Sequence, residues 1–207
     1  MEKQLRGYIF RMYPTKEQQV LIEKSFGTSR YIYNHFLEES IKLGKMNAYE
    51  LIKKIPELTK ENIWLKEVDN CLLRTTIFDL EKAYQKHEKE ERGLPKFKSK
   101  NKSRKSYRTN TYKNKKYESI KLDLERKTIT LPKLKEVKVR GYRKLNKING
   151  RIINVTVYKE ADKYYVSVCA KEVVIAPAII PSSIVGIDVG IKNLAITSDG
   201  KIYNNLK

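Results

Sequence analysis

The chain has 207 residues, which is enough for one ordinary hydrophobic core or two small modules. Lys and Arg number 44 against 24 Asp and Glu, so the formal net charge is +20, an imbalance too large for a generic soluble enzyme and typical of proteins with a polyanionic partner. Ribosomal proteins, membrane-surface proteins and proteins with a solvated, lysine-rich surface share such a charge. The clustering of the charge along the chain is therefore needed to distinguish between these classes of protein.

The two cysteines, Cys71 and Cys169, lie far apart, and neither belongs to a C-x-x-C pair. We therefore expect no zinc site and interpret both as buried free thiols. Charged residues between Glu2 and Arg11 interrupt any apolar run of the kind found in a secretory signal. The longest uncharged stretch, Val173–Ile187, contains two prolines and is too short to span a bilayer, so we expect a cytoplasmic protein.

Alternating apolar and polar residues over 5–13 predict a strand, the first strand of a β-barrel, within residues 1–14. A helix is predicted to follow, because Thr15 can cap it and Gln18 stands at the capping-box spacing. Gly27–Ser29 is interpreted as a break before a second helix. Two helices joined by such a turn resemble a helix-turn-helix, and an ordinary helical hairpin is the alternative.

Helical periodicity continues over residues 48–55 and, more strongly, over residues 72–91. In the second segment, apolar residues at helical spacing predict a buried face within a helical lobe that spans residues 15–92. These apolar residues are Leu73, Ile77, Leu80 and Tyr84. Another face of the same helix is predicted to be free to touch phosphate or bases. The candidates there are Arg74, Thr75 and Thr76.

Gly93–Pro95 ends the helical block, and the basic segment that follows, residues 96–117, contains no acid at all. Its basic side chains can neutralise phosphates, while the aromatic rings between them can stack on unpaired bases, which favours RNA or single strands over intact duplex. The candidate nucleic-acid-binding residues are Lys96, Lys98, Lys100, Lys102, Arg104, Lys105, Tyr107, Arg108 and Tyr112. The alternative is a solvated, disordered basic loop. We expect the segment to be mobile when free and ordered on nucleic acid.

From Ile120 onward the period of the apolar residues changes to two, which indicates strands. The predicted strands cover residues 120–124, 129–131, 137–139, 153–157 and 164–170. Together with the N-terminal strand they would form a small antiparallel barrel or sandwich, with the helices inserted between the strands. The basic segment and the remaining barrel are assigned to residues 93–170, and the predicted fold class is α+β.

A linker is predicted over residues 171–182, and residues 183–207 are interpreted as the start of a second domain. There a short apolar strand carries Asp188 at its end, Gly190 allows a tight backbone path, and residues 194–197 predict a returning strand. Metal-dependent phosphodiester chemistry needs several carboxylates around a pair of Mg²⁺ ions, and this segment supplies one. Asp188 is therefore the candidate catalytic residue and metal ligand, expected to bind Mg²⁺ weakly at most. The alternative is an aspartate that stabilises a turn.

Five stretches of the chain carry a family resemblance and follow the order found in that family. They are residues 8–26, Arg30–His35, Trp64–Asp69, Gly93–Lys100 and Gly186–Asn193. Together they resemble the OrfB/TnpB family encoded by bacterial insertion sequences. Its members are RNA-guided DNA nucleases related to the type V CRISPR effectors, and they were long described as transposases acting in DNA recombination. The resemblance implies a wedge-like β-barrel interrupted by a helical lobe, followed by a linker and an RNase H-like (RuvC) domain, whose first motif the last stretch resembles.

The resemblance also implies a function. We expect a truncated, transposon-encoded protein that binds a transposon-derived guide RNA and, as a second partner, DNA. We expect it not to cleave alone, because the further Mg²⁺-binding carboxylates and the zinc ribbon of the full-length family are absent. Two alternatives stay open: a nuclease-dead RNA-guided transcriptional repressor, and half of a split endonuclease whose RuvC domain a second polypeptide completes. A generic ribosomal-type RNA binder would leave the terminal strand unexplained.

Overall fold

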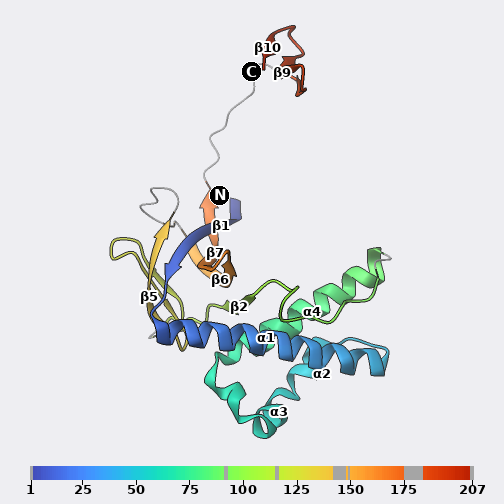
Figure 1. Ribbon diagram of the computed structural model, residues 1–207, viewed down its shortest axis with the longest axis vertical. Helices are drawn as coiled ribbons and strands as arrows, with labels where there is room; N and C mark the ends of the chain where they lie inside the picture. The colour runs from blue at the N-terminus through green and yellow to red at the C-terminus, as the bar shows by residue number, and fades with distance from the viewer. Residues whose placement is uncertain are drawn as a thin grey trace. The chain divides into compact units, whose positions relative to one another are not determined.

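The computed structural model describes residues 2–90, 93–114, 117–141, 148, 150–174 and 184–205. The chain divides into two compact units, residues 1–174 and residues 175–207. The first unit is a curled antiparallel sheet with a group of helices inserted after its first strand (Figure 1). The mixture of helices and strands that the sequence predicted is confirmed.

Seven antiparallel strands form the sheet of the first unit, in the spatial order β2-β6-β7-β1-β5-β4-β3. The strands are β1 (Glu2–Tyr13), β2 (Ser106–Asn110), β3 (Lys121–Asp123), β4 (Thr128–Leu131), β5 (Lys135–Gly141), β6 (Gly150–Glu160) and β7 (Lys163–Val174). The N-terminal strand completes the sheet as predicted, because Phe10 of β1 pairs with both Val166 of β7 and Gly141 of β5. Among the described residues β2 and β3 are its two edges, so the sheet is a curled half-barrel rather than a closed barrel.

The connection from β1 to β2 is helical. Its elements are α1 (Lys16–Leu43), α2 (Ala48–Ile52), α3 (Ile55–Glu61), the 3-10 helix η1 (Ile63–Glu67) and α4 (Asn70–Glu90). The predicted capping box is confirmed: the Gln18 backbone N–H donates to Thr15 Oγ1 at 3.3 Å, and the Thr15 N–H donates to Gln18 Oε1 at 3.0 Å. None of the described helices is long and apolar enough to cross a membrane.

The predicted break at Gly27–Ser29 is wrong, because α1 is one continuous helix of 28 residues. Buried side chains on both sides of the glycine, among them Phe26 and Ile32, hold this stretch against the core. Ser29 does not cap a new helix; its Oγ lies 3.2 Å from Oγ1 of Thr76 on α4. A glycine lowers helix stability by only about 1 kcal/mol relative to alanine, and the burial of the neighbouring apolar side chains outweighs that cost.

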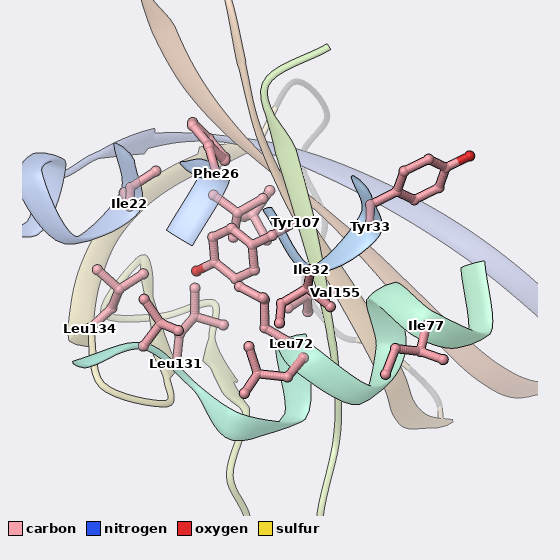
Figure 2. Packing of buried hydrophobic residues seen from close by; sticks show 14 of the residues in the cluster. Ile22, Phe26, Ile32, Tyr33, Leu72, Ile77, Tyr107, Leu131, Leu134 and Val155 are labelled. Atoms are coloured by element: carbon pink, nitrogen blue, oxygen red, sulfur yellow. The ribbon is translucent and has the colours of Figure 1, made fainter. Parts of the chain in front are cut away.

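The core of the first unit lies between α1, α4 and the sheet. Figure 2 shows Phe26 and Ile32 of α1, Leu72 of α4 and Tyr107 of β2 within one packed cluster. The predicted apolar face of α4 is confirmed as part of this core. Its members Leu73, Ile77, Leu80 and Tyr84 are all buried. The packing of α4 against both α1 and β2 therefore fixes where the basic segment begins to pair with the sheet.

The second unit is a three-stranded antiparallel sheet in the order β10-β9-β8. Its strands are β8 (Ile187–Asp188), β9 (Asn193–Thr197) and β10 (Ile202–Asn204). The predicted returning strand is confirmed as β9, and the turn after it contains Gly200 with φ of 85°, a left-handed conformation that costs glycine little. Of the predicted linker, residues 171–174 form the end of β7, and residues 175–182 lie outside the described residues.

Candidate nucleic-acid interface

A groove with a volume of about 790 Å³ lies between α1, the basic segment and the hairpin of β6 and β7. Its lining holds six cationic side chains and one carboxylate. The lining residues are Lys16, Gln19, Val20, Glu23, Lys24, Phe26, Gly27, Arg30, Lys100, Lys105, Lys159 and Tyr164. We call this feature the cationic groove. Cations gathered around a concave surface raise the local positive potential, so the groove attracts polyanions.

One face of α1 forms the helical wall of the cationic groove. The residues on it follow one another at spacings of three or four, which places them on one side of a helix. They are Lys16, Val20, Lys24, Gly27 and Arg30. Other α1 residues, Ile22 and Phe36 among them, are fully buried and hold the helix against the core. The rigid core therefore fixes the positions of these groove residues along α1.

The carboxylate in the lining already has cationic and hydroxyl partners. Glu23 Oε1 accepts a hydrogen bond from the Tyr164 hydroxyl at 3.1 Å and lies 3.3 Å from Lys159 Nζ. Partial burial acts to lower the pKa of Lys159, but the contacts with Glu23 and Tyr164 outweigh it and raise that pKa, so Lys159 stays protonated. Lys24 pairs with Glu67 at 2.5 Å in an exposed ion pair.

Within the cationic groove, four cationic side chains form no ion pair with a carboxylate of the described residues. They are Lys16, Arg30, Lys100 and Lys105. Two of them come from α1 and two from the basic segment, so the charge is concentrated only because these two segments meet.

Hydrogen bonds fix the basic segment against α1. The Asn34 side chain donates to the Lys98 carbonyl at 2.9 Å and accepts from the Lys98 N–H at 2.8 Å, so one side chain holds both backbone groups of Lys98. The Lys98 ammonium lies 3.8 Å from the centroid of the Tyr33 ring, and burial lowers its pKa. Lys98 is therefore an anchor and not an open phosphate contact. We call this contact the Asn34–Lys98 clip; it holds in place a stretch that was predicted to be mobile.

A turn after the clip directs the next cations to the cationic groove. The Ser99 N–H donates to Ser103 Oγ at 2.9 Å, and the Lys102 N–H donates to Ser99 Oγ at 3.0 Å. Lys100 lies within this compact turn and Lys105 follows it, and both line the groove. Two of the predicted contact residues are thereby brought together with α1.

Other predicted contact residues are exposed but do not line the cationic groove. They are Arg74, Lys96, Lys102, Arg104 and Tyr112. Arg104 lies over the ring of Tyr158 with its guanidinium carbon 4.3 Å from the ring centroid. These residues are accessible to a ligand, and their roles in binding stay predictions.

Tyr107 and Arg108 are not free to bind nucleic acid in the way that was predicted. Tyr107 is 4% exposed, its ring centroid lies 6.0 Å from that of Phe26, and burial raises its pKa. Arg108 is engaged by Asp79, with nitrogen–oxygen distances of 2.5 and 3.3 Å. The cause is β2, which pairs with β6 and packs on α4, so its alternate side chains turn into the core.

The prediction that Thr75 and Thr76 contact phosphate or bases is also wrong. Their exposed fractions are 1% and 3%. Thr75 Oγ1 donates to the Arg108 carbonyl at 2.5 Å, and Thr76 Oγ1 donates to the Leu72 carbonyl at 2.8 Å. The basic segment itself covers this side of α4 through β2, and of the three candidates on the helix only Arg74 stays exposed.

Four cations of the groove were not predicted from the sequence: Lys16, Lys24, Arg30 and Lys159. Acidic and apolar neighbours separate them along the chain, whereas the basic segment is dense in charge. The signal that would have found three of them is their helical spacing. That spacing becomes visible only when α1 is taken as continuous through Gly27.

Asp188 is exposed and pairs in register with Ile196 of β9. Residues 184–205 contain one further acid, Asp199. Its pKa is lowered by a hydrogen bond from Thr197 and by Lys201, whose Nζ lies 3.1 Å away. Across the described residues, no three His, Cys, Asp or Glu side chains gather closely enough to hold a metal ion. These carboxylates do not fit a pair of Mg²⁺ ions, and the role of Asp188 stays a prediction.

The half-barrel, its helical insertion and the cationic groove define an α+β protein with a concave surface that is suited to a polyanion. Residues 1–47 match the family model HTH_OrfB_IS605, which is described as a helix-turn-helix domain. In this chain those residues contain β1 and the continuous helix α1.

Two relatives match over nearly the whole chain. "Putative RNA-guided DNA endonuclease InsQ" of Escherichia coli (strain K12) is 28% identical over 211 residues, covering 97% of this chain and 49% of the relative. "Putative RNA-guided DNA endonuclease" of Streptomyces pristinaespiralis is 28% identical over 216 residues, covering 100% of this chain and 51% of the relative. The chain therefore spans about half the length of these relatives. These matches agree with the resemblance to the OrfB/TnpB family that was found in the sequence.

Among solved structures, one chain of the "Cryo-EM structure of CRISPR-Cas12f Ternary Complex" aligns with a TM-score of 0.47 and 14% sequence identity. The alignment covers 92% of this chain and 48% of that chain.

Proposed function

We propose that the first unit binds nucleic acid in the cationic groove, with a guide RNA as its first partner and DNA as its second. The observation that carries this proposal is the gathering of Lys16, Arg30, Lys100 and Lys105 on one concave surface, where none of the four forms an ion pair with a carboxylate of the described residues. Phosphates bound by these cations release counterions, which gives affinity without sequence preference. The names of both relatives, RNA-guided DNA endonucleases, support RNA and DNA as the partners.

We propose further that the second unit represents the first strands of an RNase H-like (RuvC) domain. The support is its topology: β8 carries Asp188 at its end, and β9 returns antiparallel beside it. The described residues of this unit offer two carboxylates, and Asp199 is already paired with Lys201. The chain by itself therefore binds Mg²⁺ weakly at most and does not cleave. Mg²⁺-dependent cleavage of DNA by the purified chain, lost in Asp188→Asn, would contradict this part of the proposal.

The proposed binding surface is tested by the salt dependence of RNA binding. Each phosphate contact on a single strand contributes about 0.7 to the slope of log K against log salt, so the four cations predict a slope of about −3. The double variant Arg30→Ala/Lys100→Ala should make the slope shallower by about 1.4. The control variant Lys86→Ala/Arg140→Ala removes the same charge from exposed positions that do not line the groove and should keep most of the wild-type slope. Equal changes in both variants would show that net charge acts without the groove.

The identity of the RNA requires a separate experiment. RNA that co-purifies with the chain through a high-salt wash should be sequenced from the wild type and from the groove variant. One enriched structured RNA, lost in the groove variant, is expected for a guide RNA. A mixture of abundant cellular RNAs would contradict a guide RNA as the partner while leaving nucleic-acid binding in place.

A further inference from the structure

Two smaller hollows adjoin the cationic groove on the same face of α1, with volumes of about 440 and 400 Å³. Gly27, Arg30 and Tyr31 line both of them, and Gly27 and Arg30 also line the groove. The first hollow adds Phe97 of the basic segment, and the second adds Trp64 of η1. We call them the aromatic hollows, because aromatic side chains line each of them beside Arg30.

The aromatic side chains of these hollows remain accessible although they contact one another. The rings of Tyr31 and Trp64 lie 5.1 Å apart between centroids and meet at 68°, edge to face, and His35 stacks on Tyr31 at 5.8 Å and 20°. Trp64 nevertheless stays 41% exposed and Phe97 stays 55% exposed. Large apolar rings exposed beside cations mark a binding surface more often than a structural one.

The glycine at position 27 leaves space beside the helix backbone at this place. It lies inside α1, where glycine is less stable than alanine. A Cβ added there would meet nothing within 4 Å, so neither core packing nor a close neighbouring backbone requires a glycine. Its φ is helical rather than left-handed, so the backbone does not require one either. The glycine leaves the helix backbone open toward the groove and both hollows, so a ligand can approach the backbone closely at this position.

The chemistry of the hollows matches an unpaired nucleobase. Every base has an apolar face that stacks on aromatic rings, and stacking tolerates any sequence, whereas the bases of a duplex are already stacked on one another. Arg30 between the hollows can neutralise the phosphate that links two such bases. The carboxylates in the linings, Glu38 and Glu67, each form an ion pair with a lysine, which reduces their repulsion of a bound phosphate.

We propose that the aromatic hollows bind unpaired nucleobases of a single-stranded stretch, one beside Phe97 and one beside Trp64, with Arg30 on the phosphate between them. This inference rests on the proposed function and deepens it, because it assigns this face of α1 to single-stranded rather than duplex nucleic acid. RNA and single-stranded DNA share the required chemistry. A preference for RNA would add contacts to the 2′-hydroxyl.

The test uses the only tryptophan of the chain, Trp64, as a fluorescent reporter. The full chain is titrated with a short single-stranded RNA, with DNA of the same length, with an abasic strand carrying the same number of phosphates, and with a duplex. Both base-containing single strands should change the Trp64 emission. The abasic strand should bind about 5- to 150-fold more weakly, because base–aromatic stacking is lost, and should leave the emission unchanged.

Two variants locate the effect. Phe97→Ala should weaken binding of the base-containing strand but not of the abasic strand, because Phe97 contacts the base. Tyr49→Ala removes another exposed aromatic side chain, one that lines neither hollow, and should change neither affinity. Equal binding of abasic and base-containing strands, or tighter binding of the duplex with the same emission change, overturns the inference while the proposed function stands. Absence of binding by every nucleic acid overturns the proposed function itself.

Discussion

Replacing Gly27 by alanine separates stability from binding. Alanine is more stable than glycine in a helix interior by about 0.5–1 kcal/mol, and the new methyl group meets nothing within 4 Å in the free protein. We therefore expect Gly27→Ala to raise the free energy of unfolding by that amount. For a chain of this length the melting temperature should rise by roughly 1–4 °C.

The same methyl group should weaken nucleic-acid binding, because Gly27 lines the cationic groove and both aromatic hollows. A partial loss of one base stack corresponds to about 1 kcal/mol, or roughly fivefold in affinity. Gly27→Leu, whose side chain fills more of the hollows, should weaken binding further. Circular dichroism melts measure the first effect, and titrations with single-stranded RNA measure the second.

Gly7→Ala provides the matched control. A Cβ at Gly7 also meets nothing within 4 Å, and Gly7 lies in β1 outside the groove and the hollows. Its affinity for RNA should equal that of the wild type. If Gly27→Ala is more stable yet binds as tightly as the wild type, a ligand is not the reason for the glycine. If it is less stable, the argument from helix conformation is wrong.

Four further substitutions test other contacts. Asn34→Ala should lower the free energy of unfolding by about 1–3 kcal/mol, because two hydrogen bonds to Lys98 are lost, and should weaken RNA binding without changing its salt slope. Asn47→Ala, which removes the side-chain cap of α2, should cost about 1 kcal/mol and leave the affinity unchanged, as denaturant unfolding and titration can show. Thr75→Val should cost about 1 kcal/mol in denaturant unfolding, because a β2 carbonyl loses its buried donor; no loss would contradict the buried position of Thr75. The pKa of Tyr107 is raised above 10.0 by burial, so the stability from its neutral form is complete below pH 10 and is lost as the pH rises further. The fall in melting temperature between about pH 8 and pH 11 should therefore be smaller in Tyr107→Phe than in the wild type, and an equal fall would place Tyr107 in solvent.

The parts of the fold that follow from local chemistry were predictable from the sequence. The capping box of Thr15 and Gln18 depends on residues three apart, and the buried face of α4 depends on helical spacing alone. The strands after Ile120 alternate strictly enough to give their positions. Gly27 was misinterpreted because the local cost of glycine in a helix is small beside the burial of its neighbours.

The candidate site depends on contacts between residues far apart in the chain, which a single sequence does not reveal. Tyr107 looked like a free aromatic ring within a basic segment, but pairing of β2 with β6 turns it into the core. The Asn34–Lys98 clip joins residues 64 positions apart and converts one predicted phosphate contact into an anchor. The dense basic segment supplies Lys100 and Lys105 to the groove lining, and its role in binding stays a prediction, while the part of the groove that α1 contributes was missed.

Photocrosslinking followed by mass spectrometry is the measurement that tests the central claim most directly. The full chain is crosslinked to a single-stranded RNA, digested with nuclease and protease, and the modified peptides are identified. The account predicts crosslinks in peptides that contain Arg30 and Tyr31, Trp64, and Phe97 to Lys105, since these residues line the cationic groove and the aromatic hollows. Crosslinks confined to β3, β4 and β5 or to residues 184–205, with none on α1, would contradict it.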